Sequence, residues 1–116
     1  MIDQIRPASL PAWLHSLTGS VPVLLDVRET WEFSTAAVQP LSTAPAFDVL
    51  SMPMQEIPQR MAELPTDRPI ACLCHHGIRS QRVAQFLAQN GFEHVVNIAG
   101  GIDAWSAELD PAVPHY

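Results

Sequence analysis

The chain has 116 residues, of which 47% are hydrophobic, enough to bury the core of one compact domain without a metal ion or a disulfide. Twelve acidic and six basic side chains give a formal net charge of −6, which argues against a nucleic acid or an anionic membrane as partner. No stretch approaches the ~18 apolar residues of a membrane span, and residues 1–6 lack the pattern of a secretory signal. We therefore expect a single cytoplasmic domain over residues 1–116.

The cysteines and the basic residues are distributed unevenly. The two cysteines, Cys72 and Cys74, are too close in sequence for a good structural disulfide, so at least one thiol is expected to be free. All six basic side chains are arginines, and residues 69–92 contain Arg79 and Arg82 but no acidic residue. This segment predicts a local positive region that suits a small anion.

The N-terminal half predicts one helix and two strands. Ser9 near the cap, Pro11 in the first turn and Gly19 beyond the end favour a helix over residues 9–17. The almost unbroken apolar run at 23–27 is typical of a strand that is covered on both faces, as in a parallel sheet. Three prolines interrupt residues 40–53, where only 47–52 is predicted to form a strand.

The C-terminal half alternates helices and strands. We expect a helix over 54–64, a buried strand over 69–74, a helix over about 80–90, a strand over 95–98 and a short helix over 102–107. The buried side of the 80–90 helix is predicted to carry Val83, Ala84, Phe86, Leu87 and Ala88, and Gly91 suits its C-terminal cap. This order predicts an open α/β sheet with helices on both faces.

The loop that begins at Cys74 is the candidate active site. In open α/β sheets, ligands bind beyond the carboxyl ends of the strands, which is where Cys74 stands. Free amides at the start of the following helix attract an anion and favour a thiolate, which is the nucleophilic form of cysteine. Gly77 allows a tight turn, and Arg79 is a candidate for a two-pronged contact with an oxyanion.

The loop Cys74-His75-His76-Gly77-Ile78-Arg79-Ser80 resembles the active-site loop of the rhodanese family, in particular a single-domain group with the pattern CHHG-x-RS. Two further segments, at 25–33 and 97–105, match the family in the same order along the chain. The resemblance implies a parallel sheet of about five strands between helices. It also implies transfer of sulfane sulfur from a donor such as thiosulfate to a thiophilic acceptor through a persulfide on Cys74.

The family's site residues carry over to this chain one by one. Cys74 is the expected sulfur carrier, the cradle that binds the substrate consists of His75, His76, Gly77, Ile78 and Arg79, and Asp26 and Arg28 are expected in supporting roles. A more ordinary interpretation makes Asp26 a turn residue and pairs Arg28 with Glu29 or Glu32 at the surface. Residues 34–40 differ from the family's usual turn, so the resemblance carries no expectation for residues 34–46.

Several other interpretations of the same residues are weaker. Cys72 is expected to be a core residue, because strand alternation points it inward. The two cysteines with His75 and His76 invite a zinc interpretation, but four ligands within five consecutive positions cannot easily converge on one ion, so no metal is expected. The three tryptophans, Trp13, Trp31 and Trp105, are predicted to be packing anchors. No phosphate-binding pattern is present, so no nucleotide cofactor is expected.

Two alternative functions remain open. A cysteine phosphatase or arsenate reductase also joins a nucleophilic cysteine to an arginine, but phosphatase loops have five intervening residues where Cys74 and Arg79 have four. The second alternative is a sulfur-relay or binding module that accepts sulfur and passes it to another protein without turnover. The expected partners are therefore a small anionic sulfur donor and, for the second step, a protein or thiol acceptor.

Overall fold

A computed structural model of the chain describes residues 2–17, 19–42 and 44–116. Five parallel strands form one sheet in the order β1-β5-β4-β2-β3, and their bounds are β1 Asp3–Ile5, β2 Val23–Asp26, β3 Asp48–Ser51, β4 Ile70–Leu73 and β5 Val95–Ile98. The predicted open parallel sheet of about five strands is confirmed. Met1 and Thr43, which belong to the predicted domain and to the segment 34–46, lie outside the described residues.

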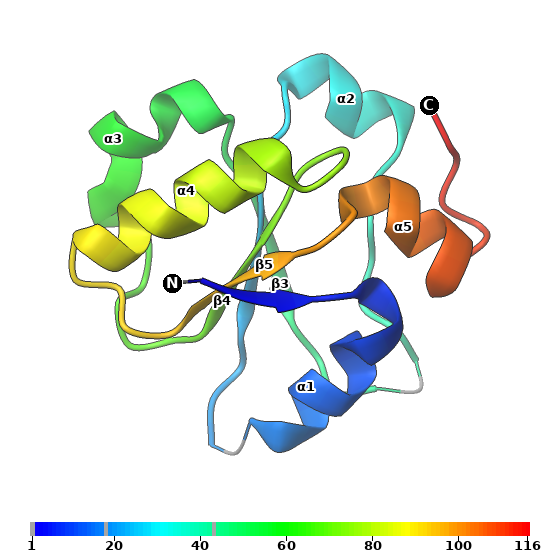
Figure 1. Cartoon of the computed structure of the whole chain (residues 1–116), viewed down its shortest axis with the longest axis horizontal. Helices are drawn as coiled ribbons and strands as arrows, with labels where there is room; N and C mark the ends of the chain where they lie inside the picture. Colours follow the sequence, from blue (N-terminus) through cyan, green and yellow to red (C-terminus); the bar gives the residue numbers. More distant parts are fainter. Residues whose placement is uncertain (1, 18, 43) are drawn as a thin grey trace.

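Helices cover both faces of the sheet, as predicted (Figure 1). One face packs against α3 (Ile57–Arg60) and α4 (Ile78–Gln89), and the other against α1 (Leu10–Ser16) and α5 (Gly101–Glu108). The remaining α-helix, α2 (Thr30–Thr35), lies at the carboxyl end of the strands. None of the helices in the described part of the chain is long and apolar enough to cross a membrane.

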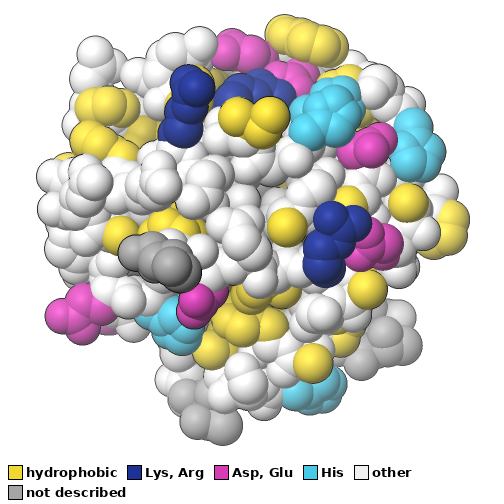
Figure 2. Space-filling model, viewed as in Figure 1, with side chains coloured by type: hydrophobic (Ala, Val, Ile, Leu, Met, Phe, Trp, Pro, Cys, Tyr) yellow, Lys and Arg dark blue, Asp and Glu magenta, His cyan; other side chains and the backbone are white. Residues whose placement is uncertain are grey.

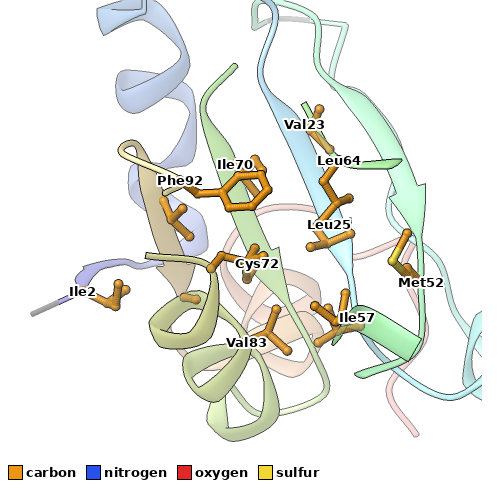
Figure 3. Close-up of a cluster of buried hydrophobic side chains, with 14 of the residues drawn as sticks. Ile2, Val23, Leu25, Met52, Ile57, Leu64, Ile70, Cys72, Val83 and Phe92 are labelled. Atoms are coloured by element: carbon orange, nitrogen blue, oxygen red, sulfur yellow. The ribbon is translucent and has the colours of Figure 1, made fainter. Parts of the chain in front are cut away.

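The two faces of the central strands are buried in alternation, which explains their continuous apolar sequences. Leu25, Ile70 and Cys72 join the cluster beneath α3 and α4, whereas Leu24 and Leu73 join the cluster beneath α1 and α5. Figure 3 shows Cys72 among the hydrophobic side chains between β4 and α4, so its prediction as a core residue is confirmed. Burial raises the pKa of the Cys72 thiol, which keeps it neutral.

Some local predictions were wrong or incomplete. The helix predicted over 54–64 consists of α3 between two short 3-10 turns, Met54–Glu56 and Met61–Glu63, with Pro58 in its first turn where no amide donor is needed. Ala88 on α4 is exposed rather than buried, and α4 begins two residues earlier than predicted. Trp105 is fully buried, but Trp31 is 63% exposed and is no packing anchor.

Two elements had no sequence prediction. Strand β1 has only three residues at the edge of the sheet, and this length is too short to show an apolar period. Helix α2 has six residues, of which only Glu32 is buried, so it lacks the apolar stripe that indicates a helix in a sequence. A third 3-10 turn, Pro7–Ser9, joins β1 to α1.

Candidate active site

Cys74 follows directly after β4, a central strand of the sheet, at the edge where the strands end. Its side chain is almost fully buried, and its Sγ accepts a hydrogen bond of 3.0 Å from the amide of Gly77. The hydroxyl oxygen of Ser80, in the first turn of α4, lies 3.3 Å from the same sulfur. The Cys74 sulfur therefore lies between one amide and one hydroxyl.

A pocket of about 270 Å³ opens beside the Cys74 sulfur and is lined by Cys74, His75, His76, Ile78 and Arg79. The fold thus brings together the predicted catalytic cysteine and four of the five predicted cradle residues. Gly77, the fifth, contributes its backbone from behind the sulfur. In the view of Figure 2, arginine side chains lie next to an exposed hydrophobic side chain in the upper part of the molecule, near the start of α4.

The shape of the loop depends on two glycines. Gly77 precedes α4 with a φ of +99°, a conformation that side chains with a Cβ rarely adopt. Gly101 packs against the loop so closely that a Cβ would lie 2.4 Å from the carbonyl oxygens of Cys74 and His75. These two carbonyls accept hydrogen bonds from the amides of Ile102 and Asp103, at 2.9 and 3.1 Å. The first turn of α5 therefore fixes the loop from below.

A buried polar chain lies on the other side of the sulfur. Ser80 is fully buried and donates to Oδ1 of Asn97 on β5, and Nδ2 of Asn97 donates to the carbonyl oxygen of Gly77 at 3.1 Å. A hydroxyl has one proton, so Ser80 serves either Asn97 or the Cys74 sulfur at a given moment. Asn97 also donates to Gln4 on β1 at 2.8 Å, which ties the loop to the edge strand.

Asp26 and Arg28 form a buried ion pair, so the interpretation of Arg28 as half of a surface pair is wrong. Asp26 is also a turn residue, because its Oδ1 accepts from the amide of Arg28 at 3.2 Å. Nη2 of Arg28 lies 2.7 Å from Oδ2 of Asp26 and also donates to the carbonyl oxygen of Ala36. Nη1 donates to the carbonyl oxygen of Glu32 and to the hydroxyl of Tyr116. Burial alone would lower the pKa of Arg28, but the hydrogen bonds to Asp26 and Tyr116 outweigh it and the pKa is raised. The pair thus fixes the chain between β2 and α2.

Glu32 holds Arg79, which changes the predicted role of this arginine. Both terminal nitrogens of Arg79 donate to the Glu32 carboxylate, at 2.7 and 2.9 Å. The carboxylate also accepts from the amide of Glu29 and from the hydroxyl of Tyr116. The Arg79 hydrogen bonds, aided by Tyr116 and opposed by burial, lower the pKa of Glu32 to about 2. An oxyanion would have to share Arg79 with this carboxylate.

His75 and His76 lie at the mouth of the pocket as a stacked pair. Their ring centroids are 3.9 Å apart, and the other face of His75 is covered by the ring of Tyr116 at the same distance. Burial, helped by the charge of His76, lowers the pKa of His75. Candidate metal-ligating atoms of His75, His76 and Asp103 lie within 4.8 Å of one another. This set differs from the one considered in the sequence, because Asp103 takes the place of the two cysteines.

The sequence analysis missed four residues that complete the site, namely Glu32, Ser80, Asn97 and Tyr116. Ser80 and Asn97 stood inside matched segments without an assigned role, and Glu32 was considered only as a partner of Arg28. Tyr116 lies 37 residues beyond Arg79, and only the folded chain shows that it reaches the loop.

Comparison with known proteins identifies the class. Residues 10–108 match the protein family described as rhodanese-like domain. A sulfurtransferase of Allochromatium vinosum is 35% identical over 97% of this chain and 96% of its own length. The chain therefore belongs to the rhodanese-like family, as its loop and its sheet predicted.

Two further similarities refine this assignment. Thiosulfate sulfurtransferase GlpE of Vibrio cholerae is 29% identical over 80% of this chain and 88% of its own length. The crystal structure of a rhodanese-like domain protein from Staphylococcus aureus superimposes with a TM-score of 0.73 and covers 99% of both chains at 23% identity. The second similarity concerns the fold alone.

Proposed function

We propose that this chain, a sulfurtransferase by homology, moves sulfane sulfur from thiosulfate or a similar small anionic donor through a persulfide on Cys74. In the first step the Cys74 thiolate attacks the outer sulfur of thiosulfate, a new S–S bond forms, and the old S–S bond breaks with its electron pair leaving on sulfite. In the second step an acceptor nucleophile, such as cyanide or a thiolate, takes the outer sulfur and restores the Cys74 thiolate.

The observation that carries this proposal is the placement of the Cys74 sulfur at the base of the 270 Å³ pocket, against the Gly77 amide. An amide N–H pointing at sulfur stabilises negative charge on the attacking thiolate and again when the acceptor has removed the outer sulfur. The start of α4, a helix of twelve residues, adds its positive dipole end beside the same atom. Both effects assist a sulfur nucleophile and a sulfur leaving group.

The test is turnover of thiosulfate and cyanide by the whole chain. We expect thiocyanate formation by the parent protein and none by Cys74→Ser. Cys72→Ala is the matched control, because it alters the other cysteine two residues away, which is fully buried and outside the pocket. Thiocyanate formation by Cys74→Ser at the parent rate would overturn the proposal.

A second candidate, sulfur relay to a protein acceptor, is supported by Ile78. This residue lines the Cys74 pocket and is 69% exposed, more than Val21, Trp31 or Val49, the other large hydrophobic side chains that the described structure exposes. A single exposed apolar side chain is ordinary on a protein surface, but the position of Ile78 beside Cys74 would bring it into contact with a protein that accepts the sulfur. If relay is the function, Ile78→Ser should slow transfer to a protein acceptor more than transfer to cyanide. Equal effects on both acceptors would mean that Ile78 only shapes the pocket.

A further inference from the structure

Residues 110–116 follow α5 and return along it to the active-site loop; we call this segment the strap. Its start is fixed by the hydrogen bond from the Asp110 amide to the Trp105 carbonyl, at 2.9 Å. Its middle is fixed by Val113, which is buried in the core beneath α5 and accepts a hydrogen bond from the Ser106 hydroxyl. Asp110 and Val113 thus attach the strap to α5, and this attachment brings Tyr116 to the active-site loop.

The side chain of Tyr116 makes two kinds of contact with the site. Its ring stacks on His75 with a centroid distance of 3.9 Å and an interplanar angle of only 6°. Its hydroxyl donates to Oε2 of Glu32 at 2.6 Å and accepts from Nη1 of Arg28 at 3.0 Å. Burial raises the pKa of Tyr116 to about 12, so the phenol keeps its proton and stays a donor to Glu32 at neutral pH.

These contacts reach two of the residues that line the Cys74 pocket, one directly and one through Glu32. His75 lines the pocket directly, and Tyr116 and His76 hold its ring between them. Glu32 does not line the pocket, but it binds both terminal nitrogens of Arg79, which does. One side chain of the strap therefore restrains two walls of the pocket, and it does so without being a lining residue itself.

We propose that Tyr116 is a positioning residue for the reaction at Cys74, with a ring that holds His75 at the mouth of the pocket and a hydroxyl that holds Glu32 and, through it, Arg79. This inference rests on the proposed function, because the step that it assists is attack of the Cys74 sulfur on an anionic donor. Positioned walls hold a reactant in line with the nucleophile, and small displacements cost rate rather than binding alone.

Two substitutions separate the ring from the hydroxyl. Tyr116→Phe keeps the stack on His75 and removes the hydroxyl contacts with Glu32 and Arg28, whereas Tyr116→Leu removes the stack as well. We expect Tyr116→Leu to lower kcat/KM for thiosulfate roughly tenfold, mostly through kcat, and Tyr116→Phe to fall between it and the parent. Ala112→Ser, at an exposed strap position, is the matched control and should behave as the parent.

The readout that a merely structural role would not move is the NMR signal of the His75 ring. In the parent and in Tyr116→Phe, stacking should shift its ring protons upfield, and in Tyr116→Leu this shift should be reduced. The pKa of His75 should also rise toward its ordinary value in Tyr116→Leu, because the ring gains solvent. The other groups that act on this titration are His76, Glu32, Asp103 and the backbone of Tyr116, and none of them is altered chemically in any variant.

Each outcome of the experiment has a distinct meaning. If the parent forms no persulfide, the proposed function fails. If the parent does form one, and Tyr116→Leu reacts at the parent rate with an unchanged His75 signal, the positioning role is overturned. A third outcome also overturns the positioning role. In it, Tyr116→Leu loses rate and unfolds at a much lower temperature, Tyr116→Phe behaves as the parent, and the His75 signal is unchanged in both. Tyr116 would then only stabilise the fold.

Discussion

Glu32→Gln tests the buried network around the loop most sharply. The Glu32 side chain is only 4% exposed and accepts both terminal nitrogens of Arg79, which holds its pKa at about 2 against an ordinary value of 4.5. A shift of this size, at ~1.4 kcal/mol per unit, corresponds to roughly 3 kcal/mol of stability. We therefore expect Glu32→Gln to lower the free energy of unfolding by about 2–3 kcal/mol at pH 7.

The same shift fixes the pH dependence. Because the folded-state pKa is lowered, the contribution of Glu32 is fully present above pH 4.5 and is lost as the pH falls toward 2. The difference in unfolding free energy between parent and Glu32→Gln should therefore shrink across this window. Urea denaturation followed by tryptophan fluorescence at several pH values measures it.

Glu63→Gln is the matched control, since Glu63 also binds an arginine through two hydrogen bonds, both 3.0 Å long, to Arg60. That pair is exposed, so its loss should hardly change stability at any pH. Equal effects of the two substitutions, or a Glu32→Gln effect that does not depend on pH, would refute the reasoning from burial.

Three further predictions concern the loop itself. Arg79→Ala should lower kcat/KM for thiosulfate about ten- to a hundredfold but should slow alkylation of Cys74 by neutral iodoacetamide less. Arg82→Ala is the control, because Arg82 does not line the Cys74 pocket. Equal effects of Arg79→Ala on both reagents would mean that Arg79 only shapes the loop. Ser80→Ala leaves Oδ1 of Asn97 without its buried donor, so it should lower the free energy of unfolding in urea by about 1–3 kcal/mol. It should also slow thiocyanate formation, and an unchanged rate would show that the hydroxyl does not assist the sulfur. A glycine inserted after Gly77 should abolish sulfur transfer and create affinity for vanadate, provided that thermal unfolding shows an intact fold, whereas efficient hydrolysis of aryl phosphates by the parent would contradict the argument from loop size.

The sequence predicted the central strands and the loop after β4, because each of them depends on residues that are neighbours in the chain. The strands around Leu25 and Cys72 are buried on both faces, and their unbroken apolar sequences reveal this directly. Gly77 and Cys74 could be placed because a turn and a nucleophile at the end of a strand are adjacent in sequence. The prediction that Arg79 contacts an oxyanion did not include Glu32, because an ion pair across 47 residues has no sequence signal.

Tyr116 shows the same limit more strongly. Its role depends on the packing of Val113 beneath α5 and on the return of the chain toward α2. No periodicity or motif encodes that path. Glu32 is similar, because it is the one buried side chain of a short helix that lacks an apolar stripe. Features that depend on contacts between distant segments require the folded chain.

The central claim is that Cys74 carries sulfur as a persulfide, and intact-protein mass spectrometry after exposure to thiosulfate tests it most directly. The account predicts that the parent and Cys72→Ala gain the mass of one sulfur atom, that a reductant removes it, and that Cys74→Ser gains nothing. Addition of sulfur to Cys74→Ser, or its absence in a folded parent protein supplied with thiosulfate, would contradict the account.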